Sequence, residues 1–212
     1  MIEIRDVTFR YQHSEVPVIT GFSAQFESGQ ITAVTGKNGC GKTTLTKLLS
    51  GMLRPTTGSI YIDGRDTSKI NLFEIGQSIG YIFQNPNRQL FNDTVWNEVA
   101  FGLRNLGLDE KKVEQETEEY LEYFDLKRYR DIYPGKLSLG EKQRLALAAV
   151  LALGTDYLVL DEPTTGLDVR RQRELREILL DIRGKLNCGI IFVSHETDFM
   201  TGLVDRELVM KA

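Results

Sequence analysis

The residues with the clearest chemical meaning form a short glycine-rich stretch. Residues 36–44 fit the pattern G-x-x-x-x-G-K-S/T, between an apolar stretch and a helix-like one. Glycines let successive backbone N–H groups surround phosphate oxygens, and a helix N-terminus adds its positive dipole end. Lys42 is expected to reach the β- and γ-phosphates, and the Thr43 hydroxyl to be a ligand for Mg²⁺. The predicted nucleotide-binding residues of this loop are Gly36, Lys37, Asn38, Gly39, Cys40, Gly41, Lys42, Thr43 and Thr44.

A second feature is a pair of carboxylates that follows an apolar stretch. Residues 157–160 are apolar at every position, which indicates a strand covered on both faces, and Asp161 and Glu162 come next. Alone, such a pair is weak evidence, because buried strands often end in solvated acids. With the glycine loop, the carboxyl edge of a parallel sheet becomes the predicted ligand site. We expect Asp161 to hold Mg²⁺ through water and Glu162 to act as general base for an attacking water.

The elements that must position these groups are typical of an α/β protein. Short apolar, β-branched stretches recur, and several are followed by Gly or Asp and then by helix-like sequence. Strands are predicted at residues 2–4 with 7–9, 31–34, 59–62, 79–83, 157–160, 190–193 and 208–210. Those before about residue 35 alternate more in polarity, which indicates antiparallel pairing. The predicted fold is a P-loop NTPase core with a mainly parallel sheet and an N-terminal antiparallel β subdomain.

The middle of the chain predicts an inserted all-helical subdomain. Residues 94–153 contain no convincing strand, and the apolar residues of 110–124 recur at helical spacing, after Asp109 as N-cap. That apolar face consists of Val113, Thr117, Tyr120, Leu121 and Phe124. We expect a single domain over residues 1–212, with the ATPase core at about 1–93 and 155–212 and the helical subdomain at about 94–154.

Composition excludes several classes of protein. The 212 residues carry 26 Lys and Arg against 30 Asp and Glu, so no nucleic acid partner is expected. Cys40 and Cys188 are too few for a disulfide framework and fit a reducing cytosol. The N-terminus does not resemble a signal peptide, and the longest apolar run, residues 145–153, is too short to span a bilayer. Membrane association is therefore expected only through a partner.

Residues 137–144, Leu-Ser-Leu-Gly-Glu-Lys-Gln-Arg, allow two interpretations. A Ser and a Gly at the start of a helix can bind a second anion. The same residues also describe an ordinary capped helix, in which Ser138 and Glu141 form a capping box. The local residues favour the capped helix, whereas the order of motifs along the chain favours the anion site.

That order resembles the nucleotide-binding domains of ATP-binding cassette (ABC) proteins over nearly the whole chain. Residues 137–144 match the signature, residues 161–168 read Asp-Glu-Pro-Thr-Thr-Gly-Leu-Asp, and residues 193–195 read Val-Ser-His. The resemblance implies that Gln84 is the Q-loop glutamine, a further Mg²⁺ ligand, and that Asp168 is the D-loop aspartate. It also implies that His195 is the switch histidine near the γ-phosphate and that Tyr11 stacks on adenine. The predicted catalytic residues are Glu162, His195, Gln84 and Lys42.

The resemblance also implies a head-to-tail dimer with a second ABC ATPase chain, identical or paralogous. Each of two ATP molecules is then held by one chain's loop and by Ser138, Gly140 and Glu141 of the other. Leu139 stands where the usual signature has Gly, and it adds bulk where the backbone approaches the partner's nucleotide. We therefore predict a site at least as slow as one with the usual signature.

Residues 84–103 are similar to the ATPase subunits of energy-coupling-factor (ECF) importers and related cobalt or nickel importers. They contain Gln-Asn-Pro, then a Gln and a Phe, then Thr-Val and Val-Ala-Phe-Gly. This similarity implies an ATP-hydrolysing importer subunit for vitamins or metal ions, with ATP and Mg²⁺ as cofactors. The implied partners are an integral membrane coupling subunit and a substrate-binding membrane subunit. The implied location is the cytoplasmic face of the cell membrane.

Other classes of ATP-binding protein agree less well with the sequence. DNA-repair ABC ATPases need a long coiled coil between the loop and the signature, and the segment between Thr43 and Ser138 is too short for it. Small-molecule P-loop kinases do not account for the signature or for His195. A soluble ABC ATPase that acts as an iron–sulfur assembly scaffold, without membrane subunits, stays open as the alternative.

Overall fold

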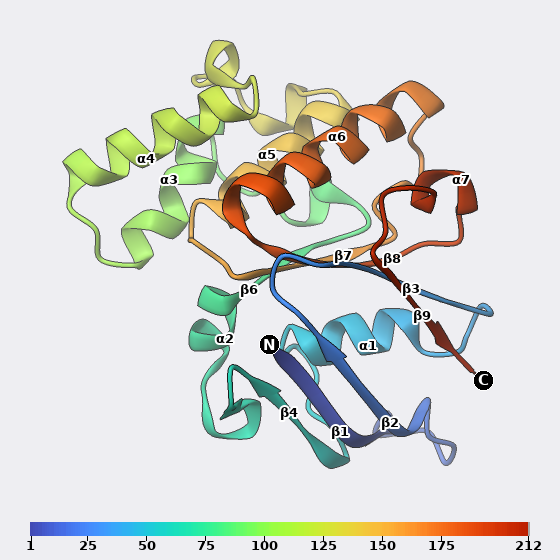
Figure 1. The fold of residues 1–212 in the computed structure, drawn as a ribbon. Coiled ribbons are helices and arrows are strands. Elements are labelled where there is room, and N and C mark those ends of the chain that lie inside the picture. Colours follow the sequence, from blue (N-terminus) through green and yellow to red (C-terminus); the bar gives the residue numbers. More distant parts are fainter. Residues whose placement is uncertain (212) are drawn as a thin grey trace. The chain divides into compact units, whose positions relative to one another are not determined.

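The computed structural model describes residues 1–211 and contains two sheets (Figure 1). The larger has five strands in the order β6-β7-β8-β3-β9. Their bounds are Ile79–Ile82 for β6, Tyr157–Asp161 for β7, Gly189–Val193 for β8, Ile31–Gly36 for β3 and Arg206–Met210 for β9. Strand β3 pairs in parallel with β8 and β9, and β7 pairs in parallel with β8. All residues of β7 and β8 are buried, as expected for central strands of a covered parallel sheet.

Helices cover both faces of this sheet. Helix α1 (Lys42–Leu49) lies against one face, and α6 (Val169–Leu186) lies on the other (Figure 1). The short helices α2 (Leu72–Ser78) and α7 (Thr197–Met200) precede β6 and β9. Leu45, Leu48 and Leu49 of α1 are fully buried in the core cluster between the two sheets. The helix that follows the glycine loop is therefore fixed by packing as well as by hydrogen bonds.

The smaller sheet is antiparallel and has the order β2-β1-β4-β5. Its strands are β1 (Ile2–Phe9), β2 (Ile19–Phe26), β4 (Thr57–Ile62) and β5 (Arg65–Asp66). The predicted antiparallel pairing is confirmed for β1. It is wrong for residues 31–34, because β3 pairs in parallel with β8 and β9, and its first five residues are all buried, as in a strand covered on both faces. Strand β2 is not among the predicted strands. The β1–β2 register shifts twice, between Ile4 and Val7 and between Val7 and Phe9. These irregularities break the alternation by which a strand is detected in sequence.

The backbone contacts divide the chain into two compact units. One comprises Met1–Tyr81 and the stretch from Asp156 onward, and it holds both sheets. The other is Ile82–Thr155. We call these the sheet unit and the helical unit.

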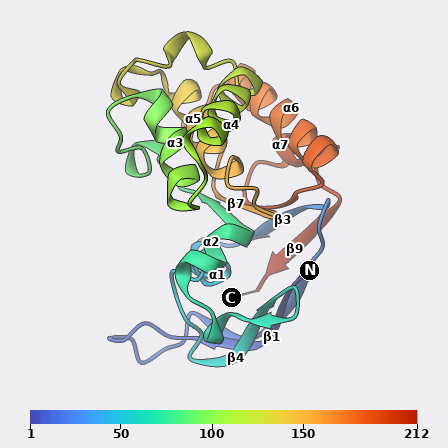
Figure 2. The same ribbon diagram turned by 90° about the vertical axis from the view of Figure 1, so that its left-hand side faces the viewer.

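The helical unit contains α3 (Val95–Asn105), α4 (Glu110–Tyr123) and α5 (Leu139–Leu151), which pack on one another (Figure 2). Residues 94–153 contain helices and turns but no strand within the described chain. The predicted N-cap is present, because Asp109 accepts a hydrogen bond from the Lys112 amide at 3.0 Å. None of the helices among residues 1–211 combines the length and apolar character needed to cross a bilayer.

Candidate functional site

The glycine loop connects β3 to α1 at the carboxyl edge of the parallel sheet. Strand β3 ends at Gly36 and α1 begins at Lys42. Gly41 is the N-cap with φ 94°, and no side chain of the described residues caps the helix there. The first-turn N–H groups of α1 thus have no side-chain acceptor, which is the arrangement that favours an anion at a helix start.

Two of the loop glycines have little room for a side chain. A Cβ on Gly36 would lie 2.5 Å from the carbonyl oxygen of Met210 and 2.8 Å from the Sγ of Cys40. A Cβ on Gly41 would meet Val18 and Ile19 at 3.0 Å, at a positive φ that disfavours other residues. Cys40 is itself buried, so its thiol fills space under the loop. The close packing keeps the loop backbone near the strand ends.

Lys42 lies inside the loop that precedes it. Its Nζ donates hydrogen bonds to the carbonyl oxygens of Gly36, at 2.9 Å, and Lys37, at 3.0 Å. The side chain is buried, with 6% of its residue surface exposed. A buried ammonium needs acceptors or an anion, and here the loop's own carbonyls provide them. The cation is therefore held where the sequence pattern predicts phosphate.

Thr43 and Asp161 lie next to each other, although 118 positions separate them in sequence. The Thr43 hydroxyl donates to Asp161 Oδ1 at 3.0 Å. Asp161 is the last residue of β7 and is 8% exposed. Burial raises the pKa of its carboxyl above the ordinary value, and the hydrogen bond from Thr43 opposes that shift. A nearby cation would stabilise this desolvated carboxylate.

These two oxygens fit Mg²⁺. A hydroxyl and a carboxylate are the hard donors that this ion prefers, and Mg²⁺ commonly keeps only one or two protein ligands and completes its shell with phosphate and water. Within residues 1–211 no cluster of three or more His, Cys, Asp or Glu side chains could hold a metal by itself. The donor set therefore suits an ion that arrives with a nucleotide.

Glu162 and His195 lie at the ends of neighbouring strands. Asp161 pairs with Val193 in the β7–β8 register, so the next residues of both strands emerge at one edge. Glu162 has φ 48°, a left-handed conformation that costs a non-glycine residue about 1 kcal/mol. The Thr165 amide donates to its carbonyl at 3.2 Å and the Thr165 hydroxyl to its Oε2 at 3.3 Å. His195 Nε2 is 3.9 Å from Glu162 Oε1.

Tyr11 contacts the loop directly. Its hydroxyl lies 3.2 Å from the Thr44 hydroxyl, and its ring packs edge-on against Phe9 with centroids 4.9 Å apart. The residue is 42% exposed. An exposed aromatic face beside the loop is compatible with the predicted stacking on adenine, which stays a prediction.

Asp168, Gln84 and the signature are the remaining predicted site residues. Asp168 is exposed and caps α6, because its carboxylate accepts from the Arg171 amide at 2.8 Å. Gln84 is exposed and belongs to the helical unit, as does the signature. Their approach to a nucleotide stays a prediction.

In the signature, both bonds of the predicted capping box are present. The Ser138 amide donates to Glu141 Oε2 at 2.8 Å, and the Glu141 amide donates to Ser138 Oγ at 3.4 Å. Hydrogen bonds from Tyr129 and Ser138 lower the pKa of Glu141 to about 2. The capped helix is thus confirmed, and it does not exclude a role for the same helix start in binding an anion.

Sequence reasoning missed Tyr81 and Thr46. The Tyr81 hydroxyl lies 3.4 Å from Asp161 Oδ2 and 3.3 Å from Thr46 Oγ1. A tyrosine hydroxyl is protonated at neutral pH, and burial raises the pKa of Tyr81 further. An aromatic residue in an apolar strand and a Thr in a helix carry no signal that could have singled them out.

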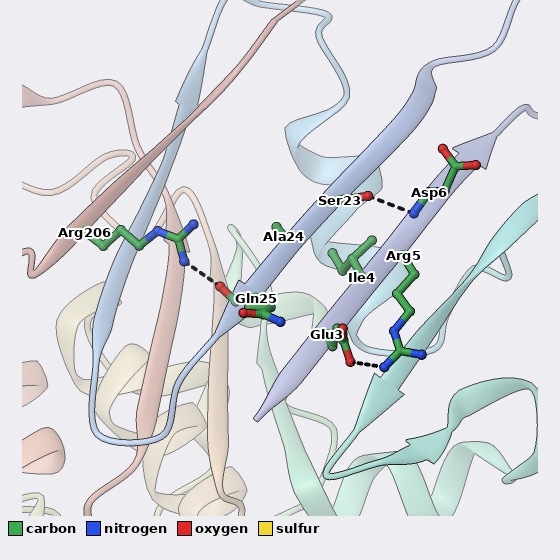
Figure 3. Close-up of a pocket in the computed structure, with 8 residues that line it drawn as sticks. All are labelled: Glu3, Ile4, Arg5, Asp6, Ser23, Ala24, Gln25 and Arg206. Carbon is green, nitrogen blue, oxygen red and sulfur yellow. Dashed lines mark hydrogen bonds and ion pairs between the residues drawn. The ribbon is translucent and has the colours of Figure 1, made fainter.

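A hollow of about 490 Å³ lies elsewhere in the sheet unit, over β1 and β2 beside Arg206 (Figure 3). Its polar groups largely bond to one another. Arg5 pairs with Glu3 at 2.6 Å, and Arg206 donates to the Gln25 carbonyl at 2.7 Å. It contains none of the predicted site residues.

A glycine loop that opens a helix, next to a strand that ends in carboxylates on a parallel sheet, defines the class of P-loop NTPases. The ABC transporter family profile matches residues 19–165. The chain belongs to this family and is an ATP-binding ATPase. The predicted fold class and the predicted activity are thereby confirmed.

The chain is similar to relatives along nearly its full length. It is 43% identical over 210 residues to a Pyrococcus furiosus protein provisionally named as an ABC transporter ATP-binding protein. The aligned region covers 99% of this chain and 80% of that protein. It is 40% identical over 214 residues to the energy-coupling factor transporter ATP-binding protein EcfA of Methanothermobacter thermautotrophicus, covering 100% of this chain and 68% of that protein. Clostridium perfringens CbiO1, described as part of the ABC transporter complex CbiONQ, matches with a TM-score of 0.90 at 31% identity, over 99% of this chain and 84% of that chain.

Proposed function

We propose that this chain is the ATP-hydrolysing subunit of an ECF-type membrane importer for vitamins or metal ions. The observation that carries ATP hydrolysis is the convergence of Lys42, Asp161 and Glu162 on one edge of the parallel sheet, with the Thr43–Asp161 bond of 3.0 Å at its centre. The similarity to EcfA and to CbiO1 supports the importer subtype. The reaction is transfer of the γ-phosphoryl group of ATP to water.

Each side chain at this edge has a proposed part in that reaction. Lys42 leaves the carbonyls of Gly36 and Lys37 and binds the β- and γ-phosphates, since phosphate oxygens are stronger acceptors. Glu162 accepts a proton from the attacking water at its carboxylate. His195, which is exposed and faces Glu162, donates a hydrogen bond to the γ-phosphate.

Thr43 and Asp161 would hold Mg²⁺, Asp161 through water, and Gln84 would add a ligand. The ion would neutralise charge on the β- and γ-phosphate oxygens. Tyr11 would stack on the adenine, which needs only an aromatic face.

The complete site requires a second cassette, identical or paralogous. The start of α5 carries Ser138 and Gly140 on a 13-residue helix, whose N-terminus favours an anion. We propose that this helix start, together with Glu141, faces the γ-phosphate held by the loop of the other chain in a head-to-tail dimer. ATP then closes the dimer, and loss of the γ-phosphate releases it.

A pair of exposed aromatic residues in the helical unit is the proposed contact for the membrane coupling subunit. Phe91 is 66% exposed and Phe101 44%, and their rings meet edge-on with centroids 5.0 Å apart. The Phe91 backbone is held firmly, because the buried carboxylate of Glu98 accepts from the amides of Phe91, at 3.0 Å, and Asn92, at 2.8 Å. An apolar surface on a fixed support suits a short amphipathic helix from a partner.

Co-purification tests the importer. The tagged chain, expressed in its native host, is recovered from detergent-solubilised membranes, and its partners are identified by mass spectrometry. We expect a coupling subunit and a substrate-binding subunit, both integral to the cytoplasmic membrane and contacting this chain from the cytoplasmic side. A purely soluble set of partners would refute the importer and favour the assembly scaffold.

The double variant Phe91→Ser/Phe101→Ser sharpens that experiment. It is expected to lose the membrane subunits while the isolated chain keeps its ATP affinity, because neither ring belongs to the nucleotide edge. Leu186→Ser, at the end of α6, changes an exposed apolar residue of the sheet unit and is the matched control. Equal recovery of membrane subunits by the double variant and the control would exclude the aromatic pair as the contact.

A further inference from the structure

The carboxylate of Asp161 is held at both of its oxygens, by two different elements. Thr43 of α1 donates to Oδ1 at 3.0 Å, and Tyr81 of β6 donates to Oδ2 at 3.4 Å. Strand β6 neighbours β7 in the parallel sheet, so the tyrosine approaches from the strand beside the aspartate. One oxygen therefore faces the glycine loop and the other faces the sheet.

Thr46 links these contacts into a ring. Its hydroxyl lies 3.3 Å from the Tyr81 hydroxyl and 2.9 Å from the Thr43 carbonyl, one turn back along α1. Each hydroxyl carries one proton, so while Tyr81 donates to Asp161, the Thr46 proton is shared between the Tyr81 oxygen and the Thr43 carbonyl. Thr46 is completely buried. The ring thus runs from Thr43 to Asp161, Tyr81, Thr46 and back to Thr43, and it joins α1, β7 and β6 through side chains.

Such a ring restricts the rotation of the Asp161 carboxylate. A carboxylate that is bonded at one oxygen only can turn about its side-chain torsion, which is broad and roughly two-fold. A second bond at Oδ2 removes that freedom before any ligand binds. In other sites, partners that orient a metal-binding side chain in this way change metal affinity by about 10–100-fold.

We propose that Tyr81 is a positioning residue for Mg²⁺, because its hydroxyl fixes Asp161 Oδ2 and keeps Oδ1 directed at Thr43. This inference rests on the proposed function, in which Thr43 and Asp161 hold the ion. Tyr81 itself binds neither the ion nor the nucleotide. Its effect is therefore on the Mg²⁺ requirement rather than on the phosphate contacts made by Lys42.

The test is the variant Tyr81→Phe, which keeps the aromatic side chain and removes the hydroxyl. Binding of a fluorescent ATP analogue is titrated against Mg²⁺ and repeated in EDTA. We expect the Mg²⁺ concentration for half-maximal binding to rise about 10–100-fold, and affinity in EDTA to stay at the wild-type value. Loss of packing alone would weaken binding equally under both conditions, and that result would overturn the inference.

Tyr61→Phe is the matched control, because Tyr61 lies on β4 of the antiparallel sheet and stacks with Arg5. It should keep the wild-type Mg²⁺ requirement. A second pair of variants tests the ring from its other side and applies even if Tyr81→Phe does not fold. Thr46→Val is expected to raise the Mg²⁺ requirement. Thr46→Ser keeps the hydroxyl and is expected to show the wild-type Mg²⁺ requirement.

The possible failures are distinguishable. If the wild-type chain binds the analogue equally well in Mg²⁺ and in EDTA, the proposed Mg²⁺ site is wrong. If the wild-type chain depends on Mg²⁺ and Tyr81→Phe or Thr46→Val depends on it to the same degree, only the positioning role of Tyr81 is wrong.

Discussion

His195 Nε2 lies 3.9 Å from Glu162 Oε1, beyond hydrogen-bond range yet close enough for the two groups to face the same space. The β7–β8 register brings them together, since Asp161 and Val193 are paired and the backbone continues past the sheet edge after each strand. A carboxylate and an imidazole so placed can act on one substrate from two sides, the first on water and the second on phosphate.

Glu162→Gln is expected to bind ATP and to lose hydrolysis by about 10²–10⁴-fold, because an amide cannot accept the proton of the attacking water. With ATP intact, the dimer should remain closed. Phosphate release measures the first effect, and light scattering after size-exclusion chromatography measures the second. The side chain keeps its size, so the turn with Thr165 is retained.

Glu177→Gln is the control for that experiment, because Glu177 is exposed on α6, away from the sheet edge. It should behave as wild type in both measurements. Hydrolysis by Glu162→Gln at the wild-type rate would show that another group is the base.

His195→Ala is expected to slow hydrolysis while ATP affinity changes little, because in the proposed reaction the imidazole acts on the γ-phosphate and the loop supplies most of the binding. Single-turnover phosphate release and equilibrium binding separate the two quantities. His13→Ala, in the polar turn after β1, is the matched control. A large loss of ATP affinity in His195→Ala, with an unchanged turnover of bound ATP, would contradict the assignment.

Lys42→Ala should lower ATP affinity by at least about 100-fold, since it removes charge-assisted bonds to the phosphates. Equilibrium binding of a fluorescent ATP analogue measures this, and Lys111→Ala on the exposed face of α4 is the control. The melting temperature without nucleotide should also fall, because the carbonyls of Gly36 and Lys37 lose the hydrogen bonds that the Lys42 ammonium donates to them. Wild-type affinity in Lys42→Ala would exclude the loop as the phosphate site.

The sequence predicted the parts of the fold that follow local rules. The apolar residues 157–160 of β7, the N-cap Asp109 and the capping box of Ser138 and Glu141 are each encoded within a few residues, and the structure contains all of them. Strand β2 was missed because Gly21, at φ 58°, and the shifted register with β1 interrupt its alternation. That strand is specified by its pairing partner more than by its own pattern.

In the candidate site, too, the locally encoded parts could be predicted and the parts that depend on distant residues could not. The loop and the carboxylates could be predicted because their chemistry restricts the residue types. Tyr81 could not, because its contact with Asp161 spans 80 positions and depends on β6 lying next to β7 in the sheet. Nothing in an apolar strand reveals which of its residues will face a carboxylate on the neighbouring strand.

Two replacements of Tyr11 should separate the contribution of its aromatic ring to ATP binding from the contribution of its hydroxyl. Tyr11→Ala is expected to weaken ATP binding by about 1–3 kcal/mol, the usual value of base–aromatic stacking. Tyr11→Phe loses only the bond to Thr44, which is worth about 1 kcal/mol or less. Equilibrium binding measures both, and inorganic tripolyphosphate, which has no base, is the control ligand. Equal loss of tripolyphosphate affinity in Tyr11→Ala would show a packing role and contradict stacking.

Leu139→Gly tests whether the size of the Leu139 side chain in the signature limits ATP turnover. Leu139 is the first residue of α5, directly after the cap Ser138. If the partner's nucleotide approaches this backbone, removing the side chain allows closer contact, so the ATPase rate should stay equal or rise. Leu139→Ala controls for the helix, because glycine costs about 1 kcal/mol relative to alanine within a helix and less at its first turn. Steady-state phosphate release measures all three proteins. A clear drop in both variants would mean that the leucine contributes to the composite site and would contradict the prediction, whereas a drop confined to Leu139→Gly would reflect glycine in the helix.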